Sequence, residues 1–241
     1  MRQSPILAAA ALLGLLALAY SNHFTNNFYF DDSHVIVNNA SIRDIRNVPS
    51  FFTDATTFSS LPANQSYRPM VTTLDAVDYW MAGGLDSVYF HGSIFAGYVL
   101  QLALLVAFFR RLLDQVRPRR RNVWIALGAT GFYGVHAANA DTINYISARS
   151  DSFSTLCIIA GLVLYQVAVT RRYHVYLVPA VIGIFTKQSG AMFAPLLLLY
   201  VALFEERLWL PGDPDTFTID RLRRAAWKAA PDADLTRMPG R

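Results

Sequence analysis

Two adjacent carboxylates follow the first apolar run of this chain, in the segment Phe28-Tyr29-Phe30-Asp31-Asp32-Ser33-His34. This segment opens a polar, acidic and aromatic stretch, residues 21–91, that separates the first apolar run from the second. Carboxylates just past the end of a membrane helix are expensive to hold near lipid, so their default interpretation is a functional site at the membrane face. Asp31 and Asp32 are therefore the first candidates for chemistry.

The composition indicates whether water or lipid surrounds the helices that position this pair. Of the 241 residues, 54% are hydrophobic and only 16% are charged, and the charges are clustered, as in a membrane protein. A helix needs about 20 residues to cross about 30 Å of hydrocarbon. Apolar runs near that length are Pro5 to Tyr20, Gly92 to Phe109, Val123 to Val135, Phe153 to Val169 and Val175 to Phe204.

The last of these runs is too long for one short span and is interrupted by Thr186-Lys187-Gln188-Ser189-Gly190. We interpret it as two short helices joined by a polar turn. The sequence thus predicts an all-α membrane protein, a polytopic bundle of about six spans with a long external first loop. Residues 1–204 form this bundle, with the loop at 21–91, and residues 205–241 are expected to be a polar cytoplasmic tail, disordered or left by a truncation.

Basic residues predict the orientation of the bundle. Six arginines lie between Arg110 and Arg121, and Arg171-Arg172 follow in the next loop on the same side, so both segments are expected in the cytoplasm. The first loop holds three arginines against seven aspartates and is expected in the periplasm or lumen. The chain would then be a multi-pass protein of a bacterial inner membrane or the endoplasmic reticulum. Its net charge of +4 reflects this topology and needs no nucleic-acid partner.

Two features of the apolar runs can be interpreted in more than one way. The N-terminal run ends in Ala17-Leu18-Ala19 and imitates a secretory signal with its cleavage site, but it is long enough to span a membrane when tilted. The lone Cys157 lies within a span, where a thiol is most often inert packing.

The first loop is expected to contain interfacial helices. A helical pattern from Met70 to Met81 is stopped by Gly83-Gly84, and its apolar residues share one face, as expected for a helix in the interface plane. Asp75 and Asp78 fall on another face, which we interpret as a solvated surface. A shorter amphipathic piece spans Arg46 to Phe52.

Six short motifs follow one another in the first loop: Phe30-Asp31-Asp32-Ser33, Ile36-Val37-Asn38-Asn39, Ser66-Tyr67-Arg68-Pro69, Asp78-Tyr79-Trp80, Gly83-Gly84-Leu85 and Tyr89-Phe90-His91. Further motifs are His136-Ala137-Ala138-Asn139-Ala140-Asp141-Thr142, Ala148-Arg149-Ser150-Asp151 and Thr186-Lys187-Gln188-Ser189-Gly190. In this order, over residues 20–204, they resemble the N-terminal part of the transmembrane and tetratricopeptide-repeat-containing proteins. That family belongs to the C-type membrane glycosyltransferases.

The resemblance implies transfer of a sugar, typically mannose, from a polyprenyl-phosphate carrier to a protein Ser or Thr. Such a reaction needs a carboxylate that takes the acceptor's proton and groups that hold the departing lipid phosphate. By analogy, Asp31 is the expected base and Asp32 its positioning partner, because neighbouring carboxylates raise each other's proton affinity. The alternative is that the pair only caps the loop and pairs with Arg43 or Arg46.

Arg149 and Lys187 are the expected phosphate ligands, because each is a cation on the outer side, against the positive-inside preference. The alternatives are an ion pair of Arg149 with Asp151 or Asp141 and simple snorkelling of Lys187. Arg68 is expected to clamp the loop or the donor.

Supporting positions are His34, His91, His136 and Asp141. The histidine spacing matches no metal motif, so we expect no metal site and no cofactor.

Some residues depart from the family pattern. Ala137 stands where a proline is expected, Asp141 where a glutamate is common, and Gln188 replaces a glutamate. Family members continue through further spans and helical repeats, and no 34-residue repeat is visible here. Three hypotheses follow. The first is a glycosyltransferase module, alone or with a second membrane subunit that supplies missing spans. The second is an inactive or split subunit that binds lipid-linked sugar or a partner enzyme. A transporter or channel ranks last, since the first four spans lack charged residues.

Overall fold

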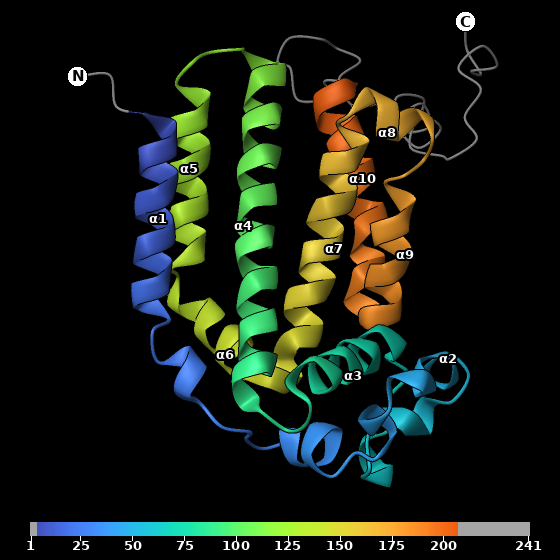
Figure 1. The fold of residues 1–241 in the computed structure, drawn as a ribbon. Helices are drawn as coiled ribbons and strands as arrows, with labels where there is room; N and C mark the ends of the chain where they lie inside the picture. Colours follow the sequence, from blue (N-terminus) through green and yellow to red (C-terminus); the bar gives the residue numbers. More distant parts are fainter. Residues whose placement is uncertain (1–3, 207–241) are drawn as a thin grey trace, which may run out of the picture.

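The computed structural model describes residues 4–206, and within them it contains helices and connecting segments but no strand. Six helices stand side by side (Figure 1): α1 (Pro5–Ala19), α4 (Ser87–Val116), α5 (Asn122–Gly134), α7 (Arg149–Tyr165), α9 (Leu177–Thr186) and α10 (Phe193–Tyr200). The prediction of an all-α membrane protein is confirmed.

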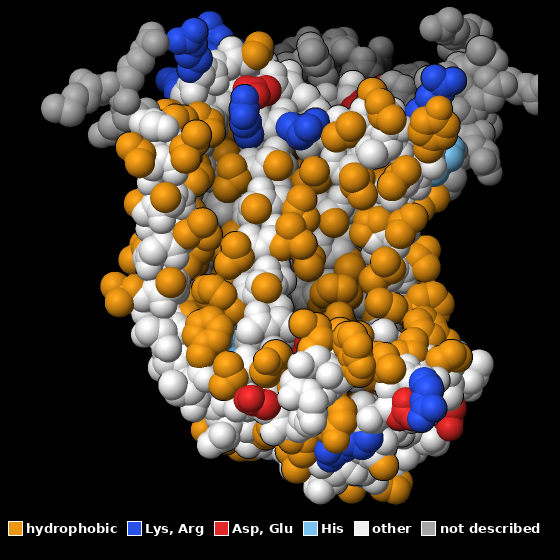
Figure 2. All heavy atoms as spheres, in the orientation of Figure 1, with side chains coloured by type: hydrophobic (Ala, Val, Ile, Leu, Met, Phe, Trp, Pro, Cys, Tyr) orange, Lys and Arg blue, Asp and Glu red, His pale blue; other side chains and the backbone are white. Residues whose placement is uncertain are grey.

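Within residues 4–206, four helical segments are long and apolar enough to cross a membrane: Pro5–Thr25, Ser87–Val116, Ile146–Tyr165 and Gln188–Glu205. The other two helices of the bundle, α5 and α9, have 13 and 10 residues and are shorter than a normal span. All the expected spans are therefore helical, while their number across the membrane stays a prediction. Figure 2 shows hydrophobic side chains over the sides of the bundle and charged side chains mainly near its two ends.

The end of the bundle against which residues 20–86 pack is called the loop end below. The arginine-rich segments, which cover the C-terminal end of α4, the α4–α5 connection and α8 (Ala168–Arg172), are both at the opposite end of the bundle (Figure 1). The predicted separation of basic segments from the first loop is thus present in the fold. Which side of a membrane each end faces stays a prediction.

The last apolar run divides as predicted. Helix α9 ends at Thr186, a short 3-10 helix covers Gln188–Met192, and α10 begins at Phe193. The turn packs closely on α9, because a Cβ atom on Gly190 would collide with the backbone of Gly183 and Ile184. A glycine at position 190 therefore permits this contact between the turn and α9.

Helix α3 (Pro69–Ala82) lies across the loop end of the bundle (Figure 1). It ends at Gly83, whose φ of 68° is the left-handed conformation that glycine adopts at helix C-termini. The predicted helix over Met70–Met81 is confirmed, and Trp80 and Met81 are exposed on it as expected. The shorter piece forms α2 (Val48–Phe51), where Phe51 is buried and Phe52 contacts Phe185 of α9.

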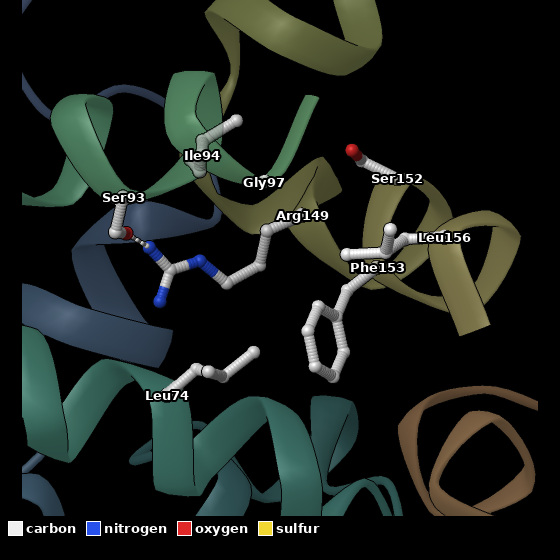
Figure 3. Close-up of a pocket in the computed structure, with 8 residues that line it drawn as sticks. All are labelled: Leu74, Ser93, Ile94, Gly97, Arg149, Ser152, Phe153 and Leu156. Atoms are coloured by element: carbon white, nitrogen blue, oxygen red, sulfur yellow. Dashed lines mark hydrogen bonds between the residues drawn. The ribbon is translucent and has the colours of Figure 1, made fainter. Parts of the chain in front are cut away.

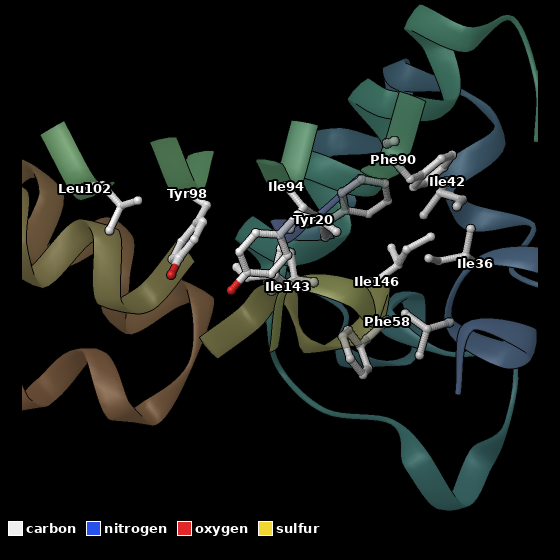
Figure 4. Packing of buried hydrophobic residues seen from close by; sticks show 14 of the residues in the cluster. Tyr20, Ile36, Ile42, Phe58, Phe90, Ile94, Tyr98, Leu102, Ile143 and Ile146 are labelled. Atoms are coloured by element: carbon white, nitrogen blue, oxygen red, sulfur yellow. The ribbon is translucent and has the colours of Figure 1, made fainter. Parts of the chain in front are cut away.

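The first loop has its own hydrophobic core, which continues into the bundle (Figure 4). Ile36 and Ile42 of the loop are fully buried together with Phe90 of α4 and Ile146, which precedes α7. A second connection segment, residues 137–148, contains α6 (Ala140–Asn144) and joins this core through Ile143. The loop is therefore folded against the bundle and positions its polar side chains there.

The tail predicted for residues 205–241 lies almost wholly outside the described residues.

Candidate functional site

The two neighbouring aspartates of the first loop lie in opposite environments. The side chain of Asp31 is 57% exposed, whereas Asp32 is 0% exposed. Oδ1 of Asp32 accepts hydrogen bonds from the backbone N–H of Ser147 at 2.9 Å and from its hydroxyl at 2.5 Å, and Oδ2 accepts one from the backbone N–H of Tyr29 at 3.0 Å. Asp32 thus ties the first loop to the residues that precede α7.

Burial raises the pKa of Asp32, and the hydrogen bonds from Ser147 and Tyr29 partly oppose this shift. The alternative in which the pair is held by Arg43 or Arg46 is wrong. Arg43 donates to the carbonyls of Val37 and Asn39, and Arg46 forms an exposed ion pair with Asp44.

Asp31 is surrounded by polar groups. His34 Nε2 lies 3.3 Å from Asp31 Oδ1, and the other ring nitrogen of His34 lies 3.0 Å from the hydroxyl of Ser59. The backbone N–H of Asp31 donates to the hydroxyl of Tyr145 at 3.0 Å. Burial raises the pKa of Tyr145, which keeps its hydroxyl protonated. The Asp31 carboxylate is therefore positioned by backbone and side chain while it faces solvent.

The residue before Asp31 is strained. Phe30 has a φ of 46°, in the left-handed region that bulky residues rarely adopt, and its side chain is almost fully exposed. Such strain costs about 1–3 kcal/mol and persists where the surroundings over-determine it, often at functional sites. The ring of Phe30 lies edge-on to Tyr145, with centroids 6.1 Å apart. The strain thus sits directly beside the exposed carboxylate.

Arg149, the first residue of α7, lies at the centre of a buried ion-pair cluster. Its Nη1 donates to Asp75 Oδ1 at 2.8 Å, and its Nη2 donates to Asp78 and, at 2.9 Å, to the hydroxyl of Ser93. The interpretation of Asp75 and Asp78 as a solvated surface is wrong: both are buried on the face of α3 that packs on the bundle. The expected ion-pair alternatives for Arg149, Asp151 and Asp141, are not its partners.

One guanidinium faces two carboxylates in this cluster, so the fully ionised group would carry one excess negative charge. Burial raises the pKa of Asp75 to about 7, against the opposing charge of Arg149 and with a further increase from the charge of Asp78. Both terminal nitrogens of the Arg149 guanidinium already have partners, and its charge is compensated. This geometry favours a role for Arg149 in attaching α3 to the bundle.

A cavity of about 80 Å³ lies beside Arg149 (Figure 3). In Figure 3 Arg149 points toward Ser93 of α4, while Leu74 and Phe153 line the apolar part of the cavity. The cavity is therefore mainly apolar, with its one cation already paired.

Lys187, the second expected phosphate ligand, and Arg68, the expected clamp of the loop or the donor, differ in their partners. Lys187 Nζ lies 2.5 Å from Asp151 Oδ1, and both side chains are partly exposed, so Lys187 does not simply snorkel. Arg68 is half-buried over the ring of Phe58, and its Nη1 donates weakly to the hydroxyl of Ser150 at 3.4 Å. Among the described residues no carboxylate is within ion-pair distance of Arg68, and its Nε has no hydrogen-bond partner. Arg68 thus keeps an uncompensated charge next to α7.

The remaining supporting positions lie apart from one another. His91 is fully buried against His23, with ring centroids 4.4 Å apart, and His23 lies 2.9 Å from the carbonyl of His91. His136 caps residues Ala137–Asn139, and Asp141 is exposed in α6. Of these four residues only His34 contacts the acidic pair. Within residues 4–206, no group of three or more His, Cys, Asp or Glu could hold a metal ion.

Sequence reasoning missed Tyr145, Ser147 and Ser93, each of which contacts an aspartate of interest. Tyr145 and Ser147 lie between the motifs at residues 136–142 and 148–151. This position in the sequence was the only signal that could have indicated a role for them.

Comparison with known proteins gives one informative similarity. Over 163 residues, 61% of this chain, it is 26% identical to the mouse protein O-mannosyl-transferase TMTC4. The aligned part is 21% of the mouse protein, so this chain corresponds to about a fifth of that relative. No family model and no solved structure matches. The similarity supports a glycosyltransferase-like module and agrees in kind with the resemblance seen in the loop motifs.

Proposed function

We propose that this chain is the module of a membrane glycosyltransferase that presents the catalytic base, and that Asp31 is this base. The observation on which the proposal depends is the difference in environment between the two aspartates of the acidic pair. Asp32 is buried and holds the loop through Ser147, while Asp31 is exposed beside it with its backbone fixed by Tyr145. A general base must be held in place and yet reach its substrate.

In the proposed reaction, a sugar moves from a polyprenyl phosphate to a Ser or Thr hydroxyl of a protein. The hydroxyl oxygen attacks the anomeric carbon, the bond from that carbon to the phosphate oxygen breaks, and Asp31 takes the hydroxyl proton. The lipid phosphate leaves with the electron pair. Mouse TMTC4 is named as a protein O-mannosyl-transferase, which supports mannose and a protein acceptor as the first substrates to test.

The leaving phosphate needs cationic groups, and Arg68 is the best candidate. Its charge is uncompensated among the described residues, and its Nε lacks a partner. Lys187 is a second candidate, because its partner Asp151 is partly exposed and the pair can open toward a phosphate. Arg149 is assigned a positioning role, since two buried aspartates neutralise it.

Replacement of the acidic pair tests the proposal. Asp31→Asn is expected to reduce transfer by about 10²- to 10⁴-fold, the usual contribution of a general base, with little change in stability. Asp32→Asn is expected to lower stability by about 1–3 kcal/mol, because a buried acceptor of three hydrogen bonds is replaced. The measurements are sugar transfer from polyprenyl-phosphate mannose in membranes and unfolding of the purified protein.

The matched control is Asp54→Asn, an exposed aspartate of the same loop that caps Thr56. It should leave transfer unchanged. Full activity of Asp31→Asn would remove Asp31 as the base.

A second candidate function is favoured by the contacts of Arg149, an expected phosphate ligand whose charge is compensated by two buried aspartates. In this alternative the chain binds lipid-linked sugar, or an enzyme that supplies further spans, without catalysing transfer alone. Wild-type protein that binds the lipid-linked sugar but transfers nothing, and gains activity with a second membrane subunit, would favour this alternative.

A further inference from the structure

A polar cavity of about 120 Å³ lies between α4, α5 and α7, separate from the cavity beside Arg149. One water molecule needs only about 10–15 Å³ of such space, so the cavity has room for a larger group. Its polar lining comes from Gln101 of α4, Tyr133 of α5, Asn139 and Thr142 of the second connection, and Ser152 and Thr155 of α7. A cavity with this lining can offer hydrogen bonds from several directions at once.

Gln101 gives this cavity an unsatisfied hydrogen-bonding group. The side chain is 1% exposed, and Nε2 donates to the hydroxyl of Tyr133 at 2.9 Å, but Oε1 has no partner within residues 4–206. If the amide is turned over, the other polar atom is left without a partner instead. Buried polar groups are nearly always hydrogen-bonded, and polar side chains inside membrane spans are rare and often functional. Gln101 therefore points to a ligand that carries hydroxyl groups.

The charges of the residues that line this cavity favour a neutral ligand. Asp151 is the one charged residue that lines the cavity, and it forms an ion pair with Lys187 at 2.5 Å. A phosphate group would find no free cation among the lining residues. Hydroxyls, amides and the ring of Tyr98 can instead hold a polyhydroxylated ring by hydrogen bonds and apolar contact.

The cavity is linked to the acidic pair by one short segment. Within residues 137–148, Asn139 and Thr142 line the cavity, while Tyr145 binds the backbone of Asp31. Ser147 of the same segment binds Asp32. A ligand in the cavity would therefore contact the segment that also positions the proposed base.

We propose that this cavity binds the sugar unit of the donor through its hydroxyl groups. The assignment rests on the proposed function and adds to it a site for the neutral hexosyl part, apart from the cations that would hold the phosphate.

Binding of matched lipids tests the assignment. Wild-type protein in lipid nanodiscs is titrated with short-chain prenyl phosphates that carry mannose or glucose, and with the same prenyl phosphate without sugar. At least one sugar-bearing lipid is expected to bind about tenfold more tightly than the bare one. Gln101→Leu and Thr142→Val should each lose about 3- to 10-fold of affinity for the sugar-bearing lipid and none for the bare lipid.

Two matched variants serve as controls. Gln115→Leu removes another glutamine of α4, which donates to the hydroxyl of Tyr200 near the C-terminal end of the helix. Thr130→Val removes a buried threonine hydroxyl of α5 that does not line the cavity. Both should bind the two classes of lipid like the wild type.

Each outcome decides the assignment. Equal affinity for sugar-bearing and bare lipids would overturn the cavity assignment alone and leave the proposed function standing. No binding of any of these lipids would overturn both. If Gln101→Leu does not fold, the test depends on Thr142→Val, because Thr142 is only half-buried. Wild-type affinity of Thr142→Val for the sugar-bearing lipid would then overturn the assignment.

Discussion

The aspartate pairs 31/32 and 75/78 belong to the same first loop, but their environments in the fold are opposite. Asp32 is buried and held by hydrogen bonds from Ser147 and Tyr29, with no cation of residues 4–206 within ion-pair distance, while Asp31 is exposed. Asp75 and Asp78 are both buried around Arg149. Adjacent residues on an irregular segment can point to different sides, whereas residues three apart on a helix share a face. The first arrangement suits chemistry with solvent or substrate, and the second suits attachment of α3.

Both pairs belong to the segment at the loop end of the bundle, and the proposed function requires this end to face the outside of the membrane. Reporters fused near Gln115 should therefore read cytoplasmic, and a reporter near Asn64 should read external, because the arginine-rich segments determine orientation. Each reporter is expected to give either a fully cytoplasmic or a fully external signal. Glycosylation of the sequons at Asn39 and Asn64 in a eukaryotic host provides an independent measurement for the loop, although Asn39 is buried in the folded chain. A cytoplasmic signal from position 64 would contradict the proposed function, since Asp31 would face away from an external donor.

Loss of Arg149 should have the largest effect on stability. Arg149→Leu leaves two buried carboxylates without a cation, and breaking a buried pair in this way typically costs about 3–5 kcal/mol. Unfolding of the purified protein in detergent measures the change. Arg46→Leu is the matched control, because it removes an exposed arginine that pairs with Asp44, and it should leave stability unchanged. Equal effects of the two variants would show that the buried cluster does not hold α3.

The buried cluster should also make stability depend on pH. The folded chain raises the pKa of Asp75 from its ordinary value near 3.8 to about 7, so the folded state binds a proton more tightly than the unfolded state does. This contribution to stability is present below pH of about 4 and is lost as the pH rises through about 7. Unfolding temperatures between pH 4 and 8 measure it. Asp75→Asn should flatten this part of the profile, and an unchanged profile in that variant would contradict the assignment.

Much of the architecture could be predicted from local patterns. Apolar runs and arginine clusters predicted the helices and their arrangement, and Gly83 and the turn at residues 186–190 predicted where α3 and α9 end. These features depend on transfer of residues to lipid and on backbone conformation, and both act on short stretches of chain. The environment of Asp75 and Asp78 could not be predicted in the same way, because their partner Arg149 is more than seventy residues away.

The sequence by itself determined that this is a helical membrane protein with an acidic, aromatic loop and a pair of carboxylates at its start. Only the tertiary structure decided that Asp31 is exposed while Asp32 is buried on Ser147, that Arg149 is neutralised by α3, and that Gln101 opens on a polar cavity. The physical reason is that burial and compensation of charge depend on side chains brought together from distant segments. Residue type and spacing alone do not show which of these groups come into contact in the folded chain.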